Sequence, residues 1–83
     1  MWFVYIVQCA DNSLYTGSCK DVTRRVHEHN HDDKKGARYT KVRRPVQLVY
    51  QESCSDRSAA GKREAAIKKL TREKKLQLIN AGS

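Results

Sequence analysis

Three side chains that could act on a phosphate group lie within a short stretch of this sequence. Tyr15, Arg25 and His29 follow one another in residues 14–29, which read as a strand, a turn at Gly17 and then a helix. A guanidinium can hold a phosphate through two parallel N–H donors, and an imidazole can take up or release a proton near neutral pH. These residue types therefore indicate phosphodiester chemistry where the strand passes to the helix.

Helical periodicity indicates how this first helix presents its side chains. Asp21 is a suitable N-cap for a helix that begins at Val22. At about 100° per residue, Val22 and Val26 share a buried stripe, and Arg25 and His29 lie at its edge one turn apart. The sequence therefore selects Arg25 as the arginine held against the fold. The opposite side of the helix is expected to carry Arg24, Glu28 and His31.

A glutamate in a late helix is the remaining candidate for chemistry. Glu64 lies at the margin of the apolar stripe of a helix predicted over about residues 56–70. An ionised carboxylate at such a position is costly unless a cation neutralises it. Three cations remain open from the residues alone: Arg25, Lys68 one helical turn further on, or a bound divalent ion. Because no second carboxylate is evident nearby, a metal here would be a single ion that keeps most of its water ligands.

The chain is short and strongly basic. Its 83 residues allow one domain, and 17 Lys and Arg against 9 Asp and Glu give a formal charge of +8. Polyanions are the expected partners. The longest apolar run, residues 2–7, is too short to span a membrane and lacks the features of a secretory signal. We therefore expect no membrane partner and a cytoplasmic, intracellular location with access to the nucleoid.

Six of the basic residues lie in residues 34–44, which we predict to be a loop that ends at Pro45. Tyr39 in this loop suits a base or sugar contact, and a tyrosine that covers the core is an equally open interpretation. Contacts with nucleic acid are expected from Lys20, Arg38, Tyr39, Lys41, Arg43 and Arg44.

The apolar pattern of the first residues predicts a hairpin. Residues 2–7 are apolar on both parities, which indicates a central strand covered on both faces. A turn at residues 11–13 leads into a second strand over residues 14–18. The sequence does not fix the register of this hairpin, and the register decides whether Tyr5 and Tyr15 share a face.

A third strand and further helices follow. The strand is predicted over residues 46–51 with one face exposed to solvent, and its other face is expected to carry Val46, Leu48 and Tyr50. The late helix has a candidate cap in Ser55, and its apolar stripe consists of Ala60, Ile67 and Leu70. Thr71 could cap a short final helix with Leu76 and Ile79 turned inward, and one uninterrupted helix is nearly as well supported.

The candidate residues occur in a recognisable order. Phe3-Val4-Tyr5 is followed ten residues later by Tyr15-Thr16-Gly17, and then by Arg25, His29 and Glu64. This order and spacing resembles the GIY-YIG nuclease superfamily, and within it a short stand-alone bacterial-type branch similar to the nuclease domain of structure-specific endonuclease subunits. The Arg-Tyr-Thr and Arg-Arg-Pro pieces at residues 38–40 and 43–45 support that placement.

The resemblance implies an α+β fold, a small three-stranded antiparallel sheet flanked by helices, with residues 1–83 as a single domain. It implies that Tyr5 is the general base or positions the water, that Tyr15 contacts or supports the phosphate, and that Arg25 clamps it. Glu64 would hold one Mg²⁺ or Mn²⁺ ion, and His29 would donate to the phosphate or relay a proton. Because a phenol with a pKa of about 10 is a poor base, a nearby cation would have to lower the pKa of Tyr5.

The function that the resemblance implies is metal-dependent hydrolysis of nucleic-acid phosphodiesters, with DNA as the expected substrate, in repair or recombination. A partner protein is expected to supply substrate specificity, because the chain has no second DNA-binding domain. The alternative is a nucleic-acid-binding module with the same fold and little or no catalytic activity. A weaker alternative is a basic protein associated with ribosomes or RNA.

Overall fold

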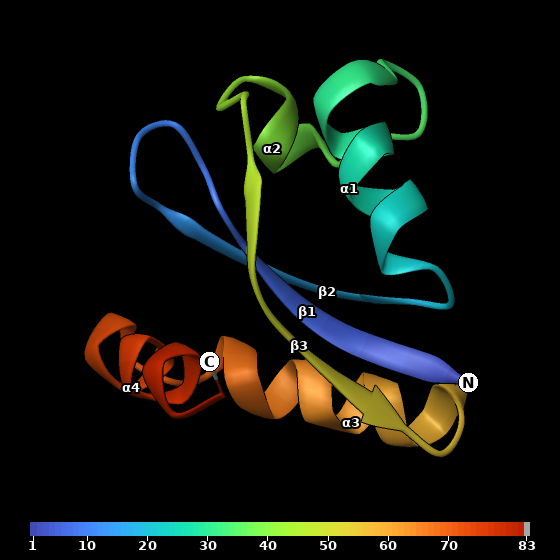
Figure 1. The fold of residues 1–83 in the computed structure, drawn as a ribbon, viewed down its shortest axis with the longest axis vertical. Helices are drawn as coiled ribbons and strands as arrows, with labels where there is room; N and C mark the ends of the chain where they lie inside the picture. The colour runs from blue at the N-terminus through green and yellow to red at the C-terminus, as the bar shows by residue number, and fades with distance from the viewer. Residues whose placement is uncertain (83) are drawn as a thin grey trace.

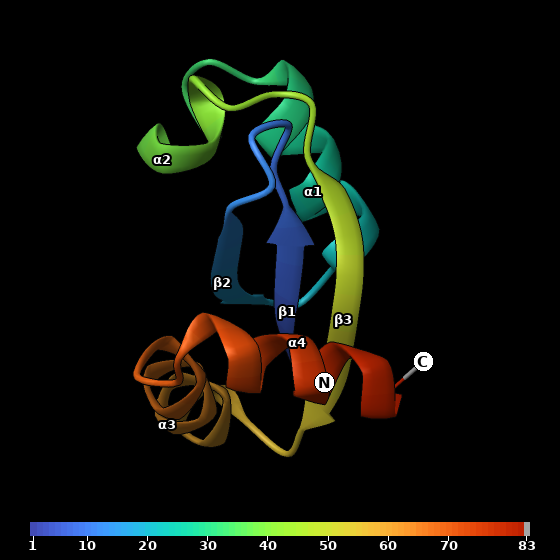
Figure 2. The ribbon, with the colours of Figure 1, turned by 90° about the vertical axis from the view of Figure 1, so that its left-hand side faces the viewer.

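The computed structural model describes residues 1–82, which form a three-stranded antiparallel sheet and four helices. The strands are β1 (Trp2–Gln8), β2 (Leu14–Cys19) and β3 (Gln47–Cys54), in the order β2-β1-β3. The helices are α1 (Val22–His31), α2 (Arg38–Lys41), α3 (Arg57–Lys68) and α4 (Arg72–Gly82). The predicted α+β class is confirmed. Figure 2 shows β1 between the two other strands, as the sequence predicts.

The sheet separates two apolar cores, because β1 buries side chains on both of its faces. The core on the α1 side contains Tyr5, Val7, Cys9, Val22 and Val46. The core on the side of α3 and α4 contains Val4, Ile6, Ala60 and Ile67. Figure 1 shows α1 and α2 above the strands and α3 and α4 below them. In the described part of the chain, no helix is both long and apolar enough to cross a membrane.

Strand β3 differs from its prediction because it contains a bulge. Ile6 lies opposite Tyr50, whereas the next residue of β1, Val7, lies opposite Leu48, so Val49 is an extra residue in β3. The bulge reverses the alternation of side chains. Leu48 therefore packs in the α1-side core and Tyr50 in the opposite core, and the prediction that they share a face is wrong. The strand also continues past residue 51 to Cys54.

The first helix begins as predicted, whereas the basic segment does not remain a loop. The Asp21 carboxylate caps α1 by accepting the backbone N–H of Arg24 at 3.1 Å. Within residues 34–44, predicted to be a loop, α2 forms one helical turn whose Thr40 is fully buried. A turn this short carries too little periodicity to be seen in the sequence.

The two last helices are separate, each with its own cap. Asp56, rather than the predicted Ser55, caps α3, because its carboxylate accepts the N–H of Ala59 at 2.8 Å. The hydroxyl of Thr71 accepts the N–H of Lys74 at 3.2 Å at the start of α4, which excludes the uninterrupted helix. The prediction that Leu76 turns inward is wrong: it is 38% exposed, and Leu78 and Ile79 pack on the core.

Candidate active site

The hairpin register brings the two motif tyrosines to one face of the sheet. Tyr5 lies opposite Gly17, and Val7 lies opposite Tyr15. Directly opposed residues of an antiparallel pair point to the same side, and Tyr5 and Val7 share a side because they are two residues apart. Tyr5 and Tyr15 therefore both face α1 without any bulge in this hairpin.

Gly17 belongs to strand β2 rather than to the predicted turn, and its role is to leave room. A Cβ atom built at Gly17 would lie 2.5 Å from the Tyr5 hydroxyl oxygen and 2.7 Å from the ring carbon Cζ. No side chain fits at such distances. The Tyr5 ring thus lies directly over the bare backbone of β2.

A buried chain of hydrogen bonds runs from Tyr5 through α1 to α2. The Tyr5 hydroxyl oxygen lies 2.7 Å from Nε2 of His29, and Nδ1 of His29 lies 2.8 Å from Oγ1 of Thr40. His29 and Thr40 are fully buried, and Tyr5 is 1% exposed. Burial fixes the three groups, because each would lose a hydrogen bond without access to water if one of them moved.

Burial controls the protonation of this pair. It raises the pKa of Tyr5 far above its ordinary value, and the charge and hydrogen bonding of Arg25 offset only part of that rise. Burial, together with the positive charges of Arg25 and Arg44, lowers the pKa of His29 to about 4. At neutral pH the protein therefore holds a protonated phenol against a neutral imidazole. The expected lowering of the Tyr5 pKa does not occur with the protein groups alone.

The arginine next to this pair is the one that helical periodicity selects. The Arg25 side chain is 26% exposed, against 67% for Arg24. Its Nη1 atom donates to Glu28 at 3.2 Å and to the carbonyl of Lys35 at 2.5 Å. The prediction that Glu28 projects to the opposite side is wrong, because its carboxylate bridges Arg24 and Arg25.

Tyr15 connects the buried chain to the surface. Its ring meets His29 edge-on at 5.4 Å and stacks on Tyr39 at 5.8 Å, with an interplanar angle of 24°. The guanidinium of Arg43 lies 3.9 Å above the Tyr39 ring. An aromatic column thus leads from His29 to Tyr39, which is 39% exposed.

Glu64 lies on α3, which packs against β1 and β2 on the other face of the sheet. Its carboxylate pairs with Lys68 at 2.7 Å rather than with Arg25, and its side chain is 24% exposed. The hydrogen bond from Lys68 to Glu64 raises the pKa of Lys68, and the hydroxyl of Tyr15 contributes to the rise. The Glu64–Lys68 pair therefore lies within electrostatic range of Tyr15.

Comparison with known proteins decides the family. A family model described as the GIY-YIG catalytic domain matches residues 1–77. The chain belongs to the GIY-YIG family. UPF0213 protein DP2720 of Desulfotalea psychrophila is 60% identical over 96% of this chain and 72% of its own length. UPF0213 protein SERP0126 of Staphylococcus epidermidis is 59% identical over 96% of this chain and 95% of its own length.

Solved structures support the same assignment. The UPF0213 protein BH0048 from Bacillus halodurans is 40% identical, with a TM-score of 0.62 over 100% of this chain and 88% of that one. The protein EF2693 from E. faecalis is 42% identical, with a TM-score of 0.63 over 95% and 82%. The predicted membership in a stand-alone GIY-YIG branch is therefore confirmed. It implies a nuclease-type function on nucleic acid, in a family that is typically metal-dependent.

The GIY-YIG domain offers a metal ion few protein ligands. The described residues contain no group of three His, Cys, Asp or Glu side chains that could hold an ion. Among the predicted catalytic residues, Glu64 is the one with a carboxylate, and it pairs with the ammonium of Lys68. This donor set fits a single hard divalent ion that keeps waters and takes phosphate oxygens as its other ligands.

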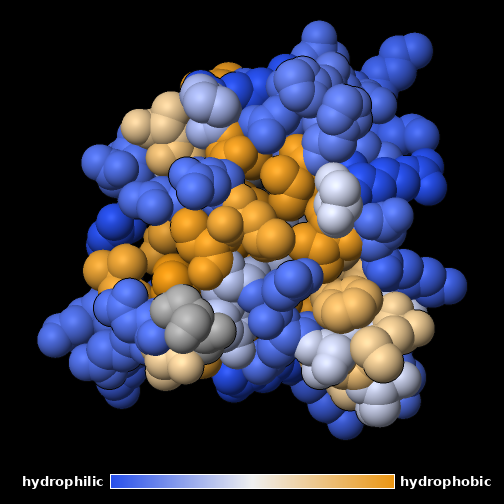
Figure 3. All heavy atoms as spheres, viewed as in Figure 1, coloured by the Kyte–Doolittle hydropathy of each residue, from blue (hydrophilic) through white to orange (hydrophobic). Residues whose placement is uncertain are grey.

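Most of the basic residues predicted to contact nucleic acid surround the outer end of the aromatic column. Arg43 donates to the Asp11 carboxylate at 3.1 Å and to the Tyr39 carbonyl at 2.9 Å. Lys41 donates to the carbonyl of Asp33 at 2.7 Å. Arg38 lies one residue before Tyr39 and is exposed. On the face drawn in Figure 3, hydrophilic residues cover α1 and α2, and apolar residues gather over the middle of the sheet.

The two remaining basic residues predicted to contact nucleic acid, Arg44 and Lys20, also have partners within the protein. Arg44 donates to the carbonyls of His29 at 2.6 Å and Asp32 at 3.1 Å, and it pairs with Asp33 at 2.9 Å, so it caps the C-terminus of α1. Lys20 lies away from the column, with its ammonium 5.7 Å from the Trp2 ring. Their contacts with nucleic acid stay predictions.

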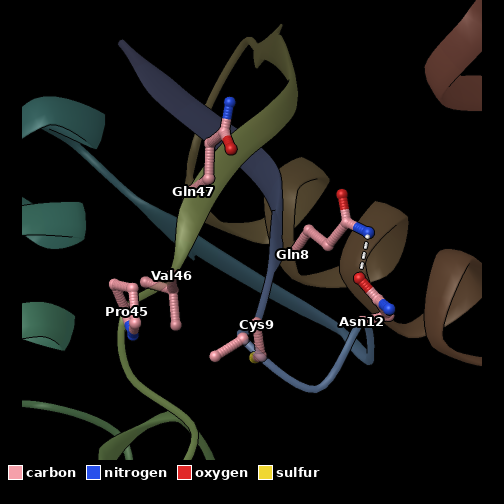
Figure 4. A pocket seen from close by; sticks show the side chains of 7 residues that line it. Gln8, Cys9, Asn12, Pro45, Val46 and Gln47 are labelled. Carbon is pink, nitrogen blue, oxygen red and sulfur yellow. Dashed lines mark hydrogen bonds between the residues drawn. The ribbon is translucent and has the colours of Figure 1, made fainter.

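A hollow at the hairpin end of the molecule is separate from the candidate active site. Its lining residues are uncharged: Gln8, Cys9, Ala10, Asn12, Pro45, Val46 and Gln47. Figure 4 shows the side chain of Gln8 pointing to Asn12, to which it donates a hydrogen bond of 3.3 Å. None of the predicted catalytic side chains lines this hollow, and its chemistry does not suit a phosphate.

Sequence reasoning missed two side chains of the site. Thr40 contacts His29 from α2, and Glu28 holds Arg25. The only sequence signal for Thr40 is its place in the Arg-Tyr-Thr piece at residues 38–40. Glu28 could have been found from its spacing, because residues three apart on a helix are neighbours and Glu28 is three residues after Arg25.

Proposed function

We propose that this GIY-YIG domain hydrolyses phosphodiester bonds of DNA with the help of one divalent ion. The observation that carries the proposal is the buried hydrogen bond between Tyr5 and His29 beside the half-buried Arg25. A phenol and a neutral imidazole in contact form a route for a proton, and a guanidinium next to them can hold a phosphate. The formal charge of +8 favours a polyanionic substrate.

Arg25 binds the scissile phosphate in this proposal. Glu28 and Lys35 both accept from its Nη1 atom, and a guanidinium has five N–H donors, so further donors are left for a phosphate. Glu28 keeps the guanidinium in place. The positive charge then stabilises the negative charge that develops on the phosphoryl oxygens in the transition state.

Tyr5 transfers a proton without becoming a phenolate. The attacking water gives one proton to the Tyr5 hydroxyl oxygen while the Tyr5 proton passes to Nε2 of His29, and the hydroxide attacks phosphorus. A phosphate bound to Arg25 neutralises part of the charge that lowers the pKa of His29, so substrate binding makes His29 a better proton acceptor. The raised pKa of Tyr5 is compatible with this route, because the phenol stays neutral throughout.

Glu64 would hold the divalent ion, Mg²⁺ or Mn²⁺, in place of its present partner Lys68. The bound ion would supply positive charge to the phosphate and the leaving oxygen. Glu64 is suited to this role because it is half-buried, and because its present partner is a flexible lysine whose ion pair is weak.

The column of Tyr15, Tyr39 and Arg43 and the neighbouring Arg38 and Lys41 position the strand around the scissile phosphate. Aromatic rings and guanidinium planes stack on bases without reading their sequence. We propose a role in DNA repair or recombination inside the cell, with a partner protein that selects the site, because these contacts supply affinity rather than specificity.

A cleavage assay tests the proposal. Single-stranded, duplex and branched DNA are incubated with the protein in Mg²⁺, in Mn²⁺ and in a chelator. We expect cleavage that requires metal, and its loss in Glu64→Ala and Arg25→Ala. Glu73→Ala and Arg24→Ala, which remove the same charges at exposed positions of α4 and α1, are the matched controls. Uncut substrates, or full activity in Glu64→Ala, would exclude the enzyme.

A nucleic-acid-binding module without catalysis is the second candidate. The observation in its favour is that the Glu64 carboxylate already pairs with Lys68 at 2.7 Å. In that case DNA binding would persist in a chelator and in Glu64→Ala and Arg25→Ala. It would decline steeply with salt and when Lys41 and Arg43 are neutralised, because each phosphate contact contributes about 0.9 to the slope of log K against log salt.

A further inference from the structure

The Thr40 hydroxyl takes part in two hydrogen bonds but has only one hydrogen atom to donate. Its Oγ1 lies 2.8 Å from Nδ1 of His29 and donates at 3.0 Å to the carbonyl of Ala37. Both Thr40 and His29 are fully buried, so water cannot replace either bond. If the hydroxyl proton is directed to Ala37, the oxygen offers Nδ1 only lone pairs. Nδ1 must then carry the imidazole proton, and Nε2 is left as an acceptor.

The groups around Tyr5 favour the same arrangement. Arg25 contributes to the environment of the Tyr5 hydroxyl, and a guanidinium is a pure donor that cannot accept the Tyr5 proton. The Tyr5 proton therefore needs another acceptor, and Nε2 of His29 is 2.7 Å away. With the other tautomer, Nε2–H would donate to the Tyr5 oxygen, and the phenol proton would lose this acceptor in a buried place.

One contact favours the opposite tautomer, and it is weak. The backbone N–H of Ala37 lies 3.4 Å from Nδ1 of His29. This distance exceeds the usual range of about 2.7–3.2 Å for such bonds. The bonds of 2.7 and 2.8 Å therefore decide the protonation of the ring.

We propose that Thr40 is a positioning residue that fixes the Nδ1–H tautomer of His29, so that Nε2 is free to take the proton of Tyr5. The catalytic consequence rests on the proposed nuclease function, whereas the tautomer does not. Thr40 never touches the substrate, and it acts through His29. Its side chain replaces the carboxylate or carbonyl that often orients a histidine in proton-transfer sites.

The placement of Thr40 also links the proton route to the substrate surface. Thr40 is the residue after Tyr39, on the single turn of α2 that Tyr39 anchors by stacking on Tyr15. A nucleotide that holds Tyr39 in place therefore also holds the hydroxyl that orients His29. Contact with the substrate and orientation of the proton acceptor depend on the same four-residue helix.

Nitrogen-15 NMR of the histidine rings tests the tautomer without any cleavage assay. The exposed His27 and His31 are replaced by Gln to assign the His29 signals. We expect Nδ1 protonated and Nε2 unprotonated in the wild-type protein at neutral pH. In Thr40→Val, which keeps the shape but lacks the hydroxyl, the ring should change to a mixture or to Nε2–H, and Thr40→Ser should restore it. A wild-type ring with Nε2–H, or an unchanged ring in Thr40→Val, would overturn the proposal.

Steady-state cleavage kinetics measure the consequence. Thr40→Val should lower kcat about tenfold, the equivalent of one hydrogen bond, with KM unchanged, and Thr40→Ser should recover most of it. If Thr40→Val does not fold, the NMR spectra of the wild-type protein and of Thr40→Ser still show which nitrogen of His29 carries the proton. The expected tautomer in a protein that cuts no DNA would refute the nuclease and leave the positioning role intact. A normal kcat in folded Thr40→Val would refute the positioning role alone.

Discussion

The hydroxyl oxygen of Tyr5 lies 2.7 Å from Nε2 of His29, where His29 is fully buried and Tyr5 is 1% exposed. The two residues come from different elements, the central strand β1 and the helix α1, and 24 positions separate them. A short hydrogen bond between a phenol and a neutral imidazole joins two uncharged groups. What relates this one to proton transfer at a phosphate is its burial beside the guanidinium of Arg25.

Removal of the Tyr5 hydroxyl should abolish cleavage and retain binding. Tyr5→Phe keeps the ring over Gly17 but removes the group that accepts the proton of water, so we expect a rate loss of about 10²–10⁴-fold. The variant should also lose about 1–3 kcal/mol of stability, because Nε2 of His29 is left without a partner. Single-turnover cleavage, DNA binding and thermal unfolding measure the three effects.

Tyr50→Phe is the matched control for this change. Its hydroxyl donates to Glu52 at 2.8 Å on β3, away from the proposed site. It should cut DNA at the wild-type rate. Equal rates in wild-type protein and Tyr5→Phe would contradict the proton route.

The stability of the protein should decrease between pH 6.5 and about 4 because of His29. Burial lowers its pKa from 6.5 to about 4, so in this range the unfolded state binds the proton and the folded state does not. The contribution of His29 is complete above pH 6.5 and is lost as pH falls, at up to about 1.4 kcal/mol per pH unit. Asp11 and Asp32, whose pKa values hydrogen bonds lower from 3.8, lose their contributions at more acidic pH.

Urea unfolding across this pH range tests the assignment. His29→Gln should flatten the dependence, and His27→Gln, on an exposed part of the same helix, should leave it as in the wild-type protein. A stability that does not change between pH 6.5 and 4.5 would show that His29 is not buried as described.

Two glycine substitutions should have opposite effects. In Gly17→Ala the new Cβ would lie 2.5 Å from the Tyr5 oxygen, so the Tyr5 ring must move. We expect the variant to lose about 1–3 kcal/mol of stability and to lose activity as well. In Gly61→Ala, inside α3, the Cβ meets nothing within 4 Å, and the helix should gain up to about 1 kcal/mol. Thermal unfolding of both variants measures these changes in stability. A Gly17→Ala variant as stable and active as the wild-type protein would refute the packing of Tyr5 against β2.

The parts of the fold that the sequence predicted are those set by local pattern. Residues 2–7 are apolar on both parities, and the strand they form is central. Asp21 stands directly before an apolar stripe of helical period, and it caps α1. The same period separates Arg25 from Arg24, because one position faces the core and the next does not.

The parts that the sequence did not predict depend on contacts between distant elements. The extra residue in β3 is defined only by its pairing with β1, so the reversed faces of Leu48 and Tyr50 carry no local signal. The single turn of α2 is too short for periodicity, and it brings Thr40 to His29 from eleven positions away. Of the two protein cations left open for Glu64, the structure pairs it with Lys68 rather than Arg25, as helical spacing allows, and the divalent ion stays a prediction.

Neutralisation of Lys68 should strengthen the binding of a divalent ion. In the structure the Lys68 ammonium lies 2.7 Å from the Glu64 carboxylate, at a position where a metal would compete with it. Lys68→Gln removes the competitor and keeps the length of the side chain. Because exposed pairs of this spacing contribute about 0.3–0.5 kcal/mol, the Mn²⁺ affinity should rise about twofold. Lys69→Gln removes a charge one residue away and should have a smaller effect. Paramagnetic broadening of NMR signals around Glu64 measures both affinities, and equal values for the two variants would show that the ion binds elsewhere.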